Sequence, residues 1–425
     1  MSTHDAGPRP SPTAPAPGGA AVRIMDRCDE LAAISAMDGG IVRAYLTPEH
    51  ARHNALAARW MAEAGLKTWQ DAAGNQCGRL EGRTPGLPAL VLGSHLDTVP
   101  DAGRYDGILG VMLAIETAAR LRPRAAELPF ALETVAFGDE EGTRFGATLL
   151  GSRAFAGTWD PEWLGLADES GTTMEQAFRA FGLDPDRVAD ASRRPEELAG
   201  YLEAHIEQGP YLEEGGRPLG IVTSIAGARR FRIAVVGEAR HAGGTPYGRR
   251  RDALVGASRA VLDIESIARA EGAIATVGQM EAFPGAVNVV PGRAELSLDL
   301  RAETDELRDR VWDLVRAEIQ AFCGGRGLGV EVEEIHAAPA VRCSPRLKDA
   351  VGAGIRATGD DSPMELFSKA GHDAMAVAGV TDMAMLFVRC EDGISHHPAE
   401  LVTAADVAVA LDALEAAVLA VAGLG

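Results

Sequence analysis

The sequence predicts an α/β protein in which a small α+β domain is inserted into a larger domain built on a mixed, mostly parallel sheet. Apolar runs at 87–92 and 130–137 flank a long apolar stretch at 108–121, and strand, helix and strand in succession are typical of a parallel sheet. Composition and rhythm change near Gly220 and stay different until about His336, which indicates a separate unit. At 425 residues and 46% hydrophobic content, the chain can bury the cores of two or three domains.

The large domain begins with segments of clear periodicity. Residues 1–20 are rich in Pro, Ala, Gly and Ser, a composition that predicts a disordered tail. Apolar residues at helical spacing predict helices over 22–34, 47–64 and 108–121. Thr47 and Pro48 suit the N-cap and first position of the second helix. Short apolar runs predict strands over 68–80, where Asn75 marks a turn, 87–92 and 130–137.

The inserted domain is expected to span 223–337, between the two parts of the large domain at 21–222 and 338–425. Its pattern is strand, helix, two strands, helix and strand, the order of a ferredoxin-like unit. These elements fall at 231–239, 251–270, 274–280, 294–301, 306–322 and 329–335. The large domain then resumes with a helix, a strand and a final apolar helix over 345–357, 383–388 and 403–424.

Charge, apolar runs and cysteines exclude several classes of function. Lys and Arg total 41 against 61 Asp and Glu, and a formal charge of −20 argues against nucleic acid or an acidic membrane surface as a partner. No uncharged apolar run approaches the roughly 18 residues that span a bilayer. The five cysteines are scattered without a Cys-x-x-Cys pair, which favours free thiols in a reducing compartment. We therefore expect a cytoplasmic protein.

Potential metal ligands follow the apolar run at 87–92. His95 and Asp97 are two residues apart, so the end of a strand projects both from one face. The Asp97 carboxylate can then accept one ring N–H of His95 while the other ring nitrogen faces a metal. Asp106 stands before the predicted helix 108–121, where its two oxygens can bridge two cations. Each residue alone is most often a solvated loop residue, but their combination on one short loop favours a metal site.

Carboxylates and a histidine follow two further strands. The strand at 130–137 ends in Gly-Asp-Glu-Glu-Gly, at the edge where open α/β sheets place their sites. Paired glutamates are usually solvated surface charges. The alternative is a division of labour in which Glu141 coordinates a metal and Glu140 acts as general base toward a water. His205, in the segment 201–210 with Gln208, is a further candidate ligand.

Other polar residues stand at turns and strand ends, where each alone has a structural explanation. In the inserted domain these are His241, Asn288 and Arg301. Near the C-terminus, Gly-Ile-Ser-His-His-Pro-Ala-Glu at 393–400 contains two adjacent histidines. One of the two can complete the metal site while the other caps or packs, and the pattern alone does not choose between them.

Six ordered motifs together resemble the allantoate amidohydrolase and N-carbamoyl-L-amino-acid hydrolase family, which belongs to the dinuclear aminoacylase-type metallohydrolases. The resemblance covers nearly the whole chain after the tail. The motifs are Gly-Ser-His-Leu-Asp-Thr-Val at 93–99, Gly-Arg-Tyr-Asp-Gly at 103–107, Asp-Glu-Glu-Gly-Thr-Arg-Phe at 139–145, His-Ile-Glu-Gln-Gly-Pro at 205–210, Ala-Gly-His-Asp-Ala at 370–374 and the segment 393–400. Six motifs in order make a chance match improbable.

The resemblance implies two divalent cations per subunit, Mn²⁺ or Zn²⁺, bridged by one aspartate. The implied ligand sets are His95, Asp106 and His396 for one metal, and Asp106, Glu141 and His205 for the other. The family's Ser-His-x-Pro-x-Glu pattern makes the first histidine the ligand, so it selects His396 over His397.

The resemblance also implies roles in catalysis and substrate binding. Glu140 falls at the position of the general base, and Asp97 at the position that orients a histidine. The positions where related enzymes hold substrate are Gln208, His241, Asn288, Arg301 and His372. In this scheme Asn288 and Arg301 grip a carboxylate, and His241 stabilises the oxyanion that develops when a carbamoyl C–N bond is attacked.

The implied reaction is hydrolysis of a ureido or carbamoyl C–N bond, which releases ammonia and carbon dioxide. The run from Met385 to His396 is most similar to allantoate amidohydrolases, so we expect allantoate as the substrate. The alternatives are N-carbamoyl-L-amino-acid hydrolase and β-ureidopropionase, and then an aminoacylase or peptidase. An alternative of a different class is a dimeric binding protein that has lost catalysis. Glu140 argues against it, because such a protein has no need of a base. Lys369 replaces a glycine of the family's substrate loop, whose detail is therefore open.

The resemblance implies a homodimer formed through the inserted domain, which would serve as both lid and dimerisation domain. His241 and Asn288 lie in that domain, whereas the proposed ligands lie in the large one. They must therefore reach the metals by closure of a lid or from another subunit. The resemblance favours a His241 that completes the site of the partner chain.

Overall fold

The computed structural model describes residues 19–424, which form two compact units. The first unit contains the described residues up to Ile221 together with 344–365 and 372–424, and the second contains 222–343 and 366–371. The loop 366–371 had been expected in the large domain, and the second unit extends to Cys343 where the sequence predicted an end at 337. Most of the expected tail lies outside the described residues, but its last two residues already belong to the first helix.

The first unit is built on a mixed sheet in the order β1-β2-β4-β3-β5-β16-β6, with β14 and β15 also paired to β6. The strands of this sheet are β1 (Lys67–Gln70), β2 (Gln76–Leu80), β3 (Ala89–His95), β4 (Ala131–Phe137), β5 (Leu198–Ile206), β6 (Leu219–Ile225), β14 (Val341–Arg342), β15 (Met364–Ser368) and β16 (Met383–Val388). The residues of β14 belong to the second unit, and β6 and β15 each have residues in both units. The central strands β4, β3, β5 and β16 pair in parallel. The pairs β1–β2, β2–β4 and β16–β6 are antiparallel, so the sheet is mixed, as expected, with parallel strands at its centre.

The antiparallel edge has a local cause. Asp71 accepts the backbone N–H groups of Ala73 and Asn75, each at 2.9 Å, and so closes a tight turn between β1 and β2. Strands joined by such a short turn must run antiparallel, whereas parallel neighbours need a crossover connection. The helix α3 (Ile108–Leu121) supplies that crossover between β3 and β4.

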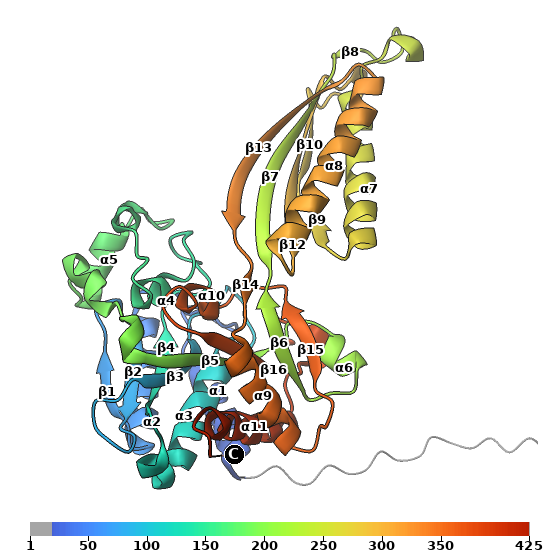
Figure 1. Ribbon diagram of the computed structural model, residues 1–425. Helices are drawn as coiled ribbons and strands as arrows, with labels where there is room; N and C mark the ends of the chain where they lie inside the picture. The colour runs from blue at the N-terminus through green and yellow to red at the C-terminus, as the bar shows by residue number, and fades with distance from the viewer. Residues whose placement is uncertain (1–18, 425) are drawn as a thin grey trace, which may run out of the picture. The chain divides into compact units, whose positions relative to one another are not determined.

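Helices of the first unit cover this sheet (Figure 1). They are α1 (Gly19–Ala32), α2 (Pro48–Glu63), α3 (Ile108–Leu121), α4 (Leu150–Phe155), α5 (Met174–Phe181), α6 (Tyr211–Glu214), α9 (Pro345–Ala357), α10 (Asp373–Val377) and α11 (Ala404–Val421). Almost every residue of α3 is buried, as its apolar sequence predicted. Thr47 caps α2 through the N–H of His50, and Pro48 occupies its first position.

The second unit has the predicted order of strand, helix, strands, helix and strand. Its elements are β7 (Gly227–Val236), β8 (Arg240–His241), α7 (Ala253–Glu271), β9 (Ile274–Thr276), β10 (Met280–Phe283), β11 (Val289–Val290), β12 (Arg293–Ala302), α8 (Asp305–Gly325) and β13 (Gly329–Ala338). The antiparallel sheet β10-β12-β7-β13 packs one face against α7 and α8 (Figure 1). Phe231 of β7 stacks on Trp312 of α8 at 3.8 Å between ring centroids.

The cysteines and the helices bear on two further expectations from the sequence. All five cysteines are buried and free, which confirms the prediction of free thiols. Among residues 19–424, no helix combines the length and the apolar character needed to cross a bilayer.

Candidate metal centre

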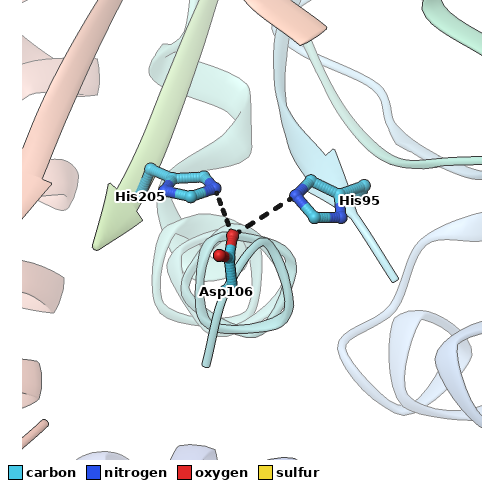
Figure 2. Close-up of side chains that lie close together, drawn as sticks. All are labelled: His95, Asp106 and His205. Atoms are coloured by element: carbon cyan, nitrogen blue, oxygen red, sulfur yellow. Dashed lines mark ion pairs between the residues drawn. The ribbon is translucent and has the colours of Figure 1, made fainter. Parts of the chain in front are cut away.

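Asp106 lies at the middle of the candidate site, in the loop between β3 and α3. Its Oδ1 atom is 3.1 Å from Nε2 of His205 and 3.7 Å from Nε2 of His95. Figure 2 draws both contacts as dashed lines. Its Oδ2 atom is 3.2 Å from Nε2 of His396. The two histidines near Oδ1 end neighbouring parallel strands, β3 and β5, and are buried, whereas the side chain of His396 is half-exposed on a loop.

The glycine before α3 makes this approach possible. Gly107 has φ +71°, and a Cβ atom there would lie 2.3 Å from Nε2 of His95. Any side chain at this position would therefore displace the His95 ring from Asp106. The motif Tyr-Asp-Gly thus places an aspartate against a histidine because the next residue has no side chain.

The backbone fixes how each buried histidine presents its ring. Nδ1 of His95 is 3.1 Å from the carbonyl oxygen of Asp97, and Nδ1 of His205 is 2.9 Å from that of Ile206. A carbonyl oxygen only accepts, so each Nδ1 carries the proton and each Nε2 has a lone pair. Both lone pairs face a carboxylate oxygen, and within residues 19–424 Nε2 of His205 has no hydrogen-bond partner. Three acceptors turned toward one another form a set that a cation fits.

The donor atoms form two groups that share Asp106. Those of His95, Asp106 and His205 lie within 4.8 Å of one another, and so do those of Asp106, Glu141 and His396. Nε2 of His396 is 3.4 Å from Oε1 of Glu141. These groups differ from the expected sets, in which His205 and His396 were exchanged. The reason is that His205 ends the strand beside His95, which the motif order alone does not show.

Asp97 connects two loops of the site. Nδ1 of His95 is 3.1 Å from the main-chain oxygen of Asp97 and 3.6 Å from its carboxylate. The contact with the carboxylate, which the sequence predicted, is therefore the longer of the two. The carboxylate instead accepts the backbone N–H groups of Glu140 and Glu141, each at 3.1 Å. Burial raises the pKa of Asp97, but His95 and these two N–H groups outweigh it and hold the pKa below the usual value. Asp97 therefore fixes the loop that carries the proposed base.

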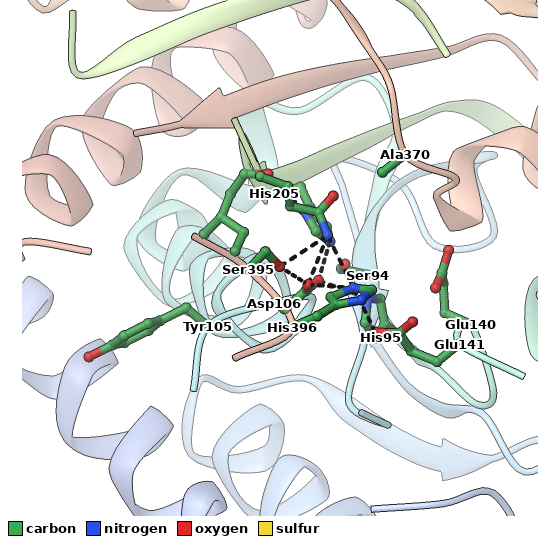
Figure 3. A network of polar contacts seen from close by, with 12 residues as sticks. Ser94, His95, Tyr105, Asp106, Glu140, Glu141, His205, Ala370, Ser395 and His396 are labelled. Atoms are coloured by element: carbon green, nitrogen blue, oxygen red, sulfur yellow. Dashed lines mark hydrogen bonds and ion pairs between the residues drawn. The ribbon is translucent and has the colours of Figure 1, made fainter. Parts of the chain in front are cut away.

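Glu140 and Glu141 come from the loop after β4 and lie close together beside His95 (Figure 3). Burial raises the pKa of Glu140 well above its usual value, and the carboxylates of Glu141 and Asp373 raise it further, against the opposing effect of His95. A carboxyl group of this kind can both accept and return a proton.

The second histidine of the pair has a different role from the first. Nδ1 of His397 accepts the N–H of Ala399 at 3.1 Å, which stabilises the turn after the proposed ligand. His396 alone of the two faces Asp106 and Glu141, in agreement with the choice made from the family pattern.

Gln208 and His372, expected to bind substrate, both lie at the first unit's site. The amide of Gln208 donates to Oδ2 of Asp106 at 2.8 Å. The ring of His372 is buried against that of His205, with centroids 4.4 Å apart, and burial lowers its pKa well below the usual value. In this structure Gln208 orients the shared carboxylate, a contact that sequence reasoning did not predict.

The remaining expected residues lie in the second unit. Nδ1 of His241 accepts the N–H of Gly244 at 2.9 Å, and strand pairing places His241 opposite Val289, next to Asn288. The guanidinium of Arg301 binds Asp299 with Nε at 2.8 Å and Nη2 at 3.2 Å, and its Nη1 donates to the carbonyl oxygen of Lys369 at 2.7 Å. The structure thus places His241 next to Asn288. It pairs one side of the Arg301 guanidinium, Nε and Nη2, with Asp299.

Three residues that sequence reasoning did not assign complete the network. The buried carboxylate of Glu203 accepts the hydroxyl of Ser94 at 2.9 Å and the N–H of Ala374 at 3.0 Å. Ser395 donates to Oδ2 of Asp106 at 2.5 Å, and Glu400 accepts backbone N–H groups of the same loop. Glu203 could have been found from its spacing, because it precedes His205 by two residues and so lies on the same face of the strand.

Comparisons with known proteins agree with this geometry. The pattern of Peptidase family M20/M25/M40 matches residues 91–420. The chain is 40% identical to an N-carbamoyl-L-amino acid amidohydrolase of Geobacillus stearothermophilus over 92% of this chain and 96% of that protein. It is 38% identical to an allantoate deiminase of Arabidopsis thaliana over 90% of this chain and 79% of that protein. A hydantoinase/carbamoylase family amidase of Burkholderia multivorans has a similar structure, with a TM-score of 0.87, 34% identity and coverage of 95% and 98% of the two chains.

These matches confirm the resemblance inferred from the six motifs. They extend over most of the chain and include both units. The relatives carry two activity names, one for N-carbamoyl amino acids and one for allantoate. The chain therefore belongs to the M20 peptidase family and, within it, to the metal-dependent amidohydrolases that act on carbon–nitrogen bonds other than peptide bonds.

Proposed function

We propose that the chain hydrolyses the ureido C–N bond of a small substrate that carries a carboxylate, and that this substrate is allantoate. The observation that carries the proposal is the position of Glu140, held by Asp97 beside two groups of metal donors that share Asp106. A protein that only binds its ligand needs no base at this place. The products would be ureidoglycine, ammonia and carbon dioxide.

The donor chemistry fits two divalent cations. Imidazole and carboxylate ligands without a thiolate suit Zn²⁺ or Mn²⁺. His95 and His205 would hold one ion and Glu141 and His396 the other, with Asp106 common to both. When bound, these ions supply the positive charge that acidifies a water molecule and polarises a carbonyl oxygen.

The protein's own residues then move the proton. Glu140 takes a proton from the attacking water and gives it to the nitrogen that leaves, so the same carboxyl group acts as base and then as acid. The contacts from Asp97 to the backbone of Glu140 and Glu141 keep the base at a constant position during both steps. His241 is proposed as the donor to the developing oxyanion, since its Nδ1 accepts from Gly244 and its proton is therefore on Nε2.

The carboxylate of the substrate is assigned to Asn288 and Arg301. Asp299 occupies Nε and Nη2 on one side of the guanidinium, which leaves the N–H groups at its end for a second carboxylate. Nη1 also holds Lys369 of the loop 366–371, so the residue that departs from the family pattern is connected to the proposed carboxylate site through its main chain.

One observation supports a second candidate, the hydrolysis of N-carbamoyl-L-amino acids. The relative from Geobacillus with that name is 40% identical and aligns over 96% of its length. The preference for allantoate depends on the sequence run from Met385 to His396, which forms β16 and the loop to the proposed ligand.

A substrate panel tests the proposal. Purified protein would be freed of metal with a chelator, reloaded with Mn²⁺ or Zn²⁺, and assayed for ammonia from allantoate, N-carbamoyl-L-amino acids and N-carbamoyl-β-alanine. N-acetyl amino acids, which share the carboxylate but lack the ureido group, are the control, and their cleavage is measured as free amino acid because it releases acetate and no ammonia. We expect ammonia from allantoate first and only in reloaded protein. Full activity in metal-free protein, or cleavage of N-acetyl amino acids alone, would contradict the proposal.

A further inference from the structure

A buried carboxylate outside the expected catalytic set connects the two loops that carry Asp106 and His396. Oε1 of Glu400 accepts the backbone N–H of Tyr105 at 2.7 Å and that of Asp106 at 3.1 Å. Oε2 is 3.2 Å from the hydroxyl of Ser395. Glu400 is only 4% exposed, so the two backbone donors replace water that its carboxyl group loses on folding.

The same network includes an oxygen of the shared metal ligand. The hydroxyl of Ser395 donates to Oδ2 of Asp106 at 2.5 Å, and this is the oxygen that faces His396 (Figure 3). Ser395 immediately precedes His396, so a displacement of one moves the other. Glu400 thus contacts the Asp106 loop through two backbone N–H groups and the His396 loop through the neighbouring serine.

The loop 393–401 depends on such contacts because it has no regular secondary structure around the ligand. His396 has φ +55°, a left-handed conformation that costs a non-glycine residue free energy unless its surroundings hold it. The N–H of Glu400 donates to the carbonyl oxygen of His397 at 3.0 Å, which places the Glu400 side chain under the turn. His95 and His205, in contrast, end strands of the central sheet.

We propose that Glu400 is a positioning residue that holds the Asp106 loop against the His396 loop and thereby sets the cation affinity of the group Asp106, Glu141 and His396. It acts through Asp106 and Ser395 and contacts neither the substrate nor the reacting atoms. The group of His95, Asp106 and His205 depends on it less, since two of its three ligands are held by the sheet.

The sequence provides a second way to disturb the same contact. A Cβ atom on Gly103 would lie 2.4 Å from the carboxyl group of Glu400. Gly103→Ala therefore keeps every ligand and Glu400 itself, but pushes the carboxylate away from the N–H groups of Tyr105 and Asp106. The replacement should reproduce the effect of removing Glu400.

The test is a titration of metal-free protein with Mn²⁺, followed by calorimetry or by the electron paramagnetic resonance of the free ion, without substrate. We expect two ions per chain in the wild type. Glu400→Ala and Gly103→Ala should bind one ion within a few-fold of the wild-type affinity and the other about 10- to 100-fold more weakly. Glu400→Gln can still accept both N–H groups with its amide oxygen and donate to Ser395, so its second ion should bind within a few-fold of wild type.

Glu133 provides a matched control for general destabilisation. It is also a buried glutamate, 4% exposed, and it lies on β4 between Arg79 and Arg193, each at 2.7 Å. Glu133→Ala removes as much buried carboxylate contact but should leave both Mn²⁺ affinities unchanged. Circular dichroism identifies variants that have folded, and Glu400→Gln and Gly103→Ala keep the test valid if Glu400→Ala does not fold.

The outcomes separate this inference from the proposed function on which its metal centre rests. Wild-type affinity for both ions in folded Glu400→Ala and Gly103→Ala would overturn the positioning role. Equal weakening of both ions, or the same weakening in Glu133→Ala, would also overturn it. If the wild type binds no Mn²⁺ or Zn²⁺ at all, the proposed function itself fails. A different substrate in the ammonia assay would leave the inference intact.

Discussion

Glu140 is the residue whose replacement separates base chemistry from metal binding. Glu140→Gln keeps the size of the side chain but removes its ability to take a proton, so we expect turnover to fall by about 10²- to 10⁴-fold while both ions remain bound. Glu141→Gln serves as the comparison, because it should weaken the ion shared with His396. The measurement is turnover together with metal content by elemental analysis. Metal lost from Glu140→Gln in step with activity would make Glu140 a ligand.

At the scale of single residues, the sequence predicted which residues belong to the site better than it predicted their contacts. The motifs placed His95, Asp106 and His205 at one site, and the structure brings them together. The role of the Asp97 carboxylate was only partly predicted, because its contacts are to backbone N–H groups of a loop more than forty residues away. Backbone donors carry no side-chain signature, so a motif does not reveal them.

Arg301 illustrates the same limit. The sequence assigned its guanidinium to a substrate carboxylate, and the structure shows Asp299 already bound to one side of it. Asp299 lies two residues earlier on the same strand, a spacing that places both side chains on one face. The alternation was visible in the sequence, but it does not tell an internal ion pair from a substrate site.

At the scale of elements, local periodicity predicted bounds but not pairing. The bounds of α3, α9 and β16 agree with the predicted ranges 108–121, 345–357 and 383–388. The strand β6 was missed, and its antiparallel pairing with β16 is one reason why the sheet is mixed. Apolar runs report burial of a segment, whereas strand direction depends on the connection, which lies outside the run.

The helix α2 carries a buried histidine that should make the first unit sensitive to acid. Nδ1 of His50 accepts the N–H of Leu46 at 2.9 Å, and Nε2 is 3.1 Å from the carbonyl oxygen of Gly74, so the ring is neutral with its proton on Nε2. Burial lowers the pKa of His50 to about 4. The unfolded chain takes up this proton near the ordinary pKa of about 6.5, so the stabilisation is complete above that pH and is lost as the pH falls toward 4.

We expect His50 to account for about 2 kcal/mol of the fall in unfolding free energy between pH 7 and pH 5. Urea unfolding of metal-free wild type and His50→Gln at both pH values measures it, because the variant should lose that much less on acidification. His53, stacked on His50 at 4.9 Å, stays in both proteins. Identical losses in the two proteins would show that His50 does not titrate in this range.

At the scale of the whole molecule, the division into two units raises the question of which chain supplies His241. The proposed ligands and Glu140 lie in the first unit, whereas His241 and Asn288 lie in the second. His241 is exposed, and so are Tyr247, six residues later, at 85%, and Val287, two residues before the strand partner Val289 of His241, at 105%. Exposed apolar side chains that form a contiguous patch mark a contact surface. We propose that the protein is a homodimer in which each His241 completes the site of the partner chain.

Complementation between inactive variants tests this arrangement. His241→Ala should lower turnover by about 10²- to 10³-fold through loss of one oxyanion donor, and Glu140→Gln is inactive for lack of a base. In a mixed dimer, the chain with Glu140 intact receives His241 from its partner, so one of the two sites is competent. Random mixing of equal amounts makes half of the dimers mixed, and activity should recover to about a quarter of the wild-type value.

A second mixture distinguishes complementation from simple stabilisation. Glu140→Gln mixed with His95→Ala gives dimers in which each chain has a defect in its own first unit, so neither site becomes competent and no activity should return. Mass spectrometry of subunits with different isotope labels shows whether mixed dimers have formed. If they form and the His241→Ala and Glu140→Gln mixture stays inactive, His241 acts within its own chain. A protein that remains monomeric at assay concentration would exclude the exchange altogether, since no partner then exists to supply the ring.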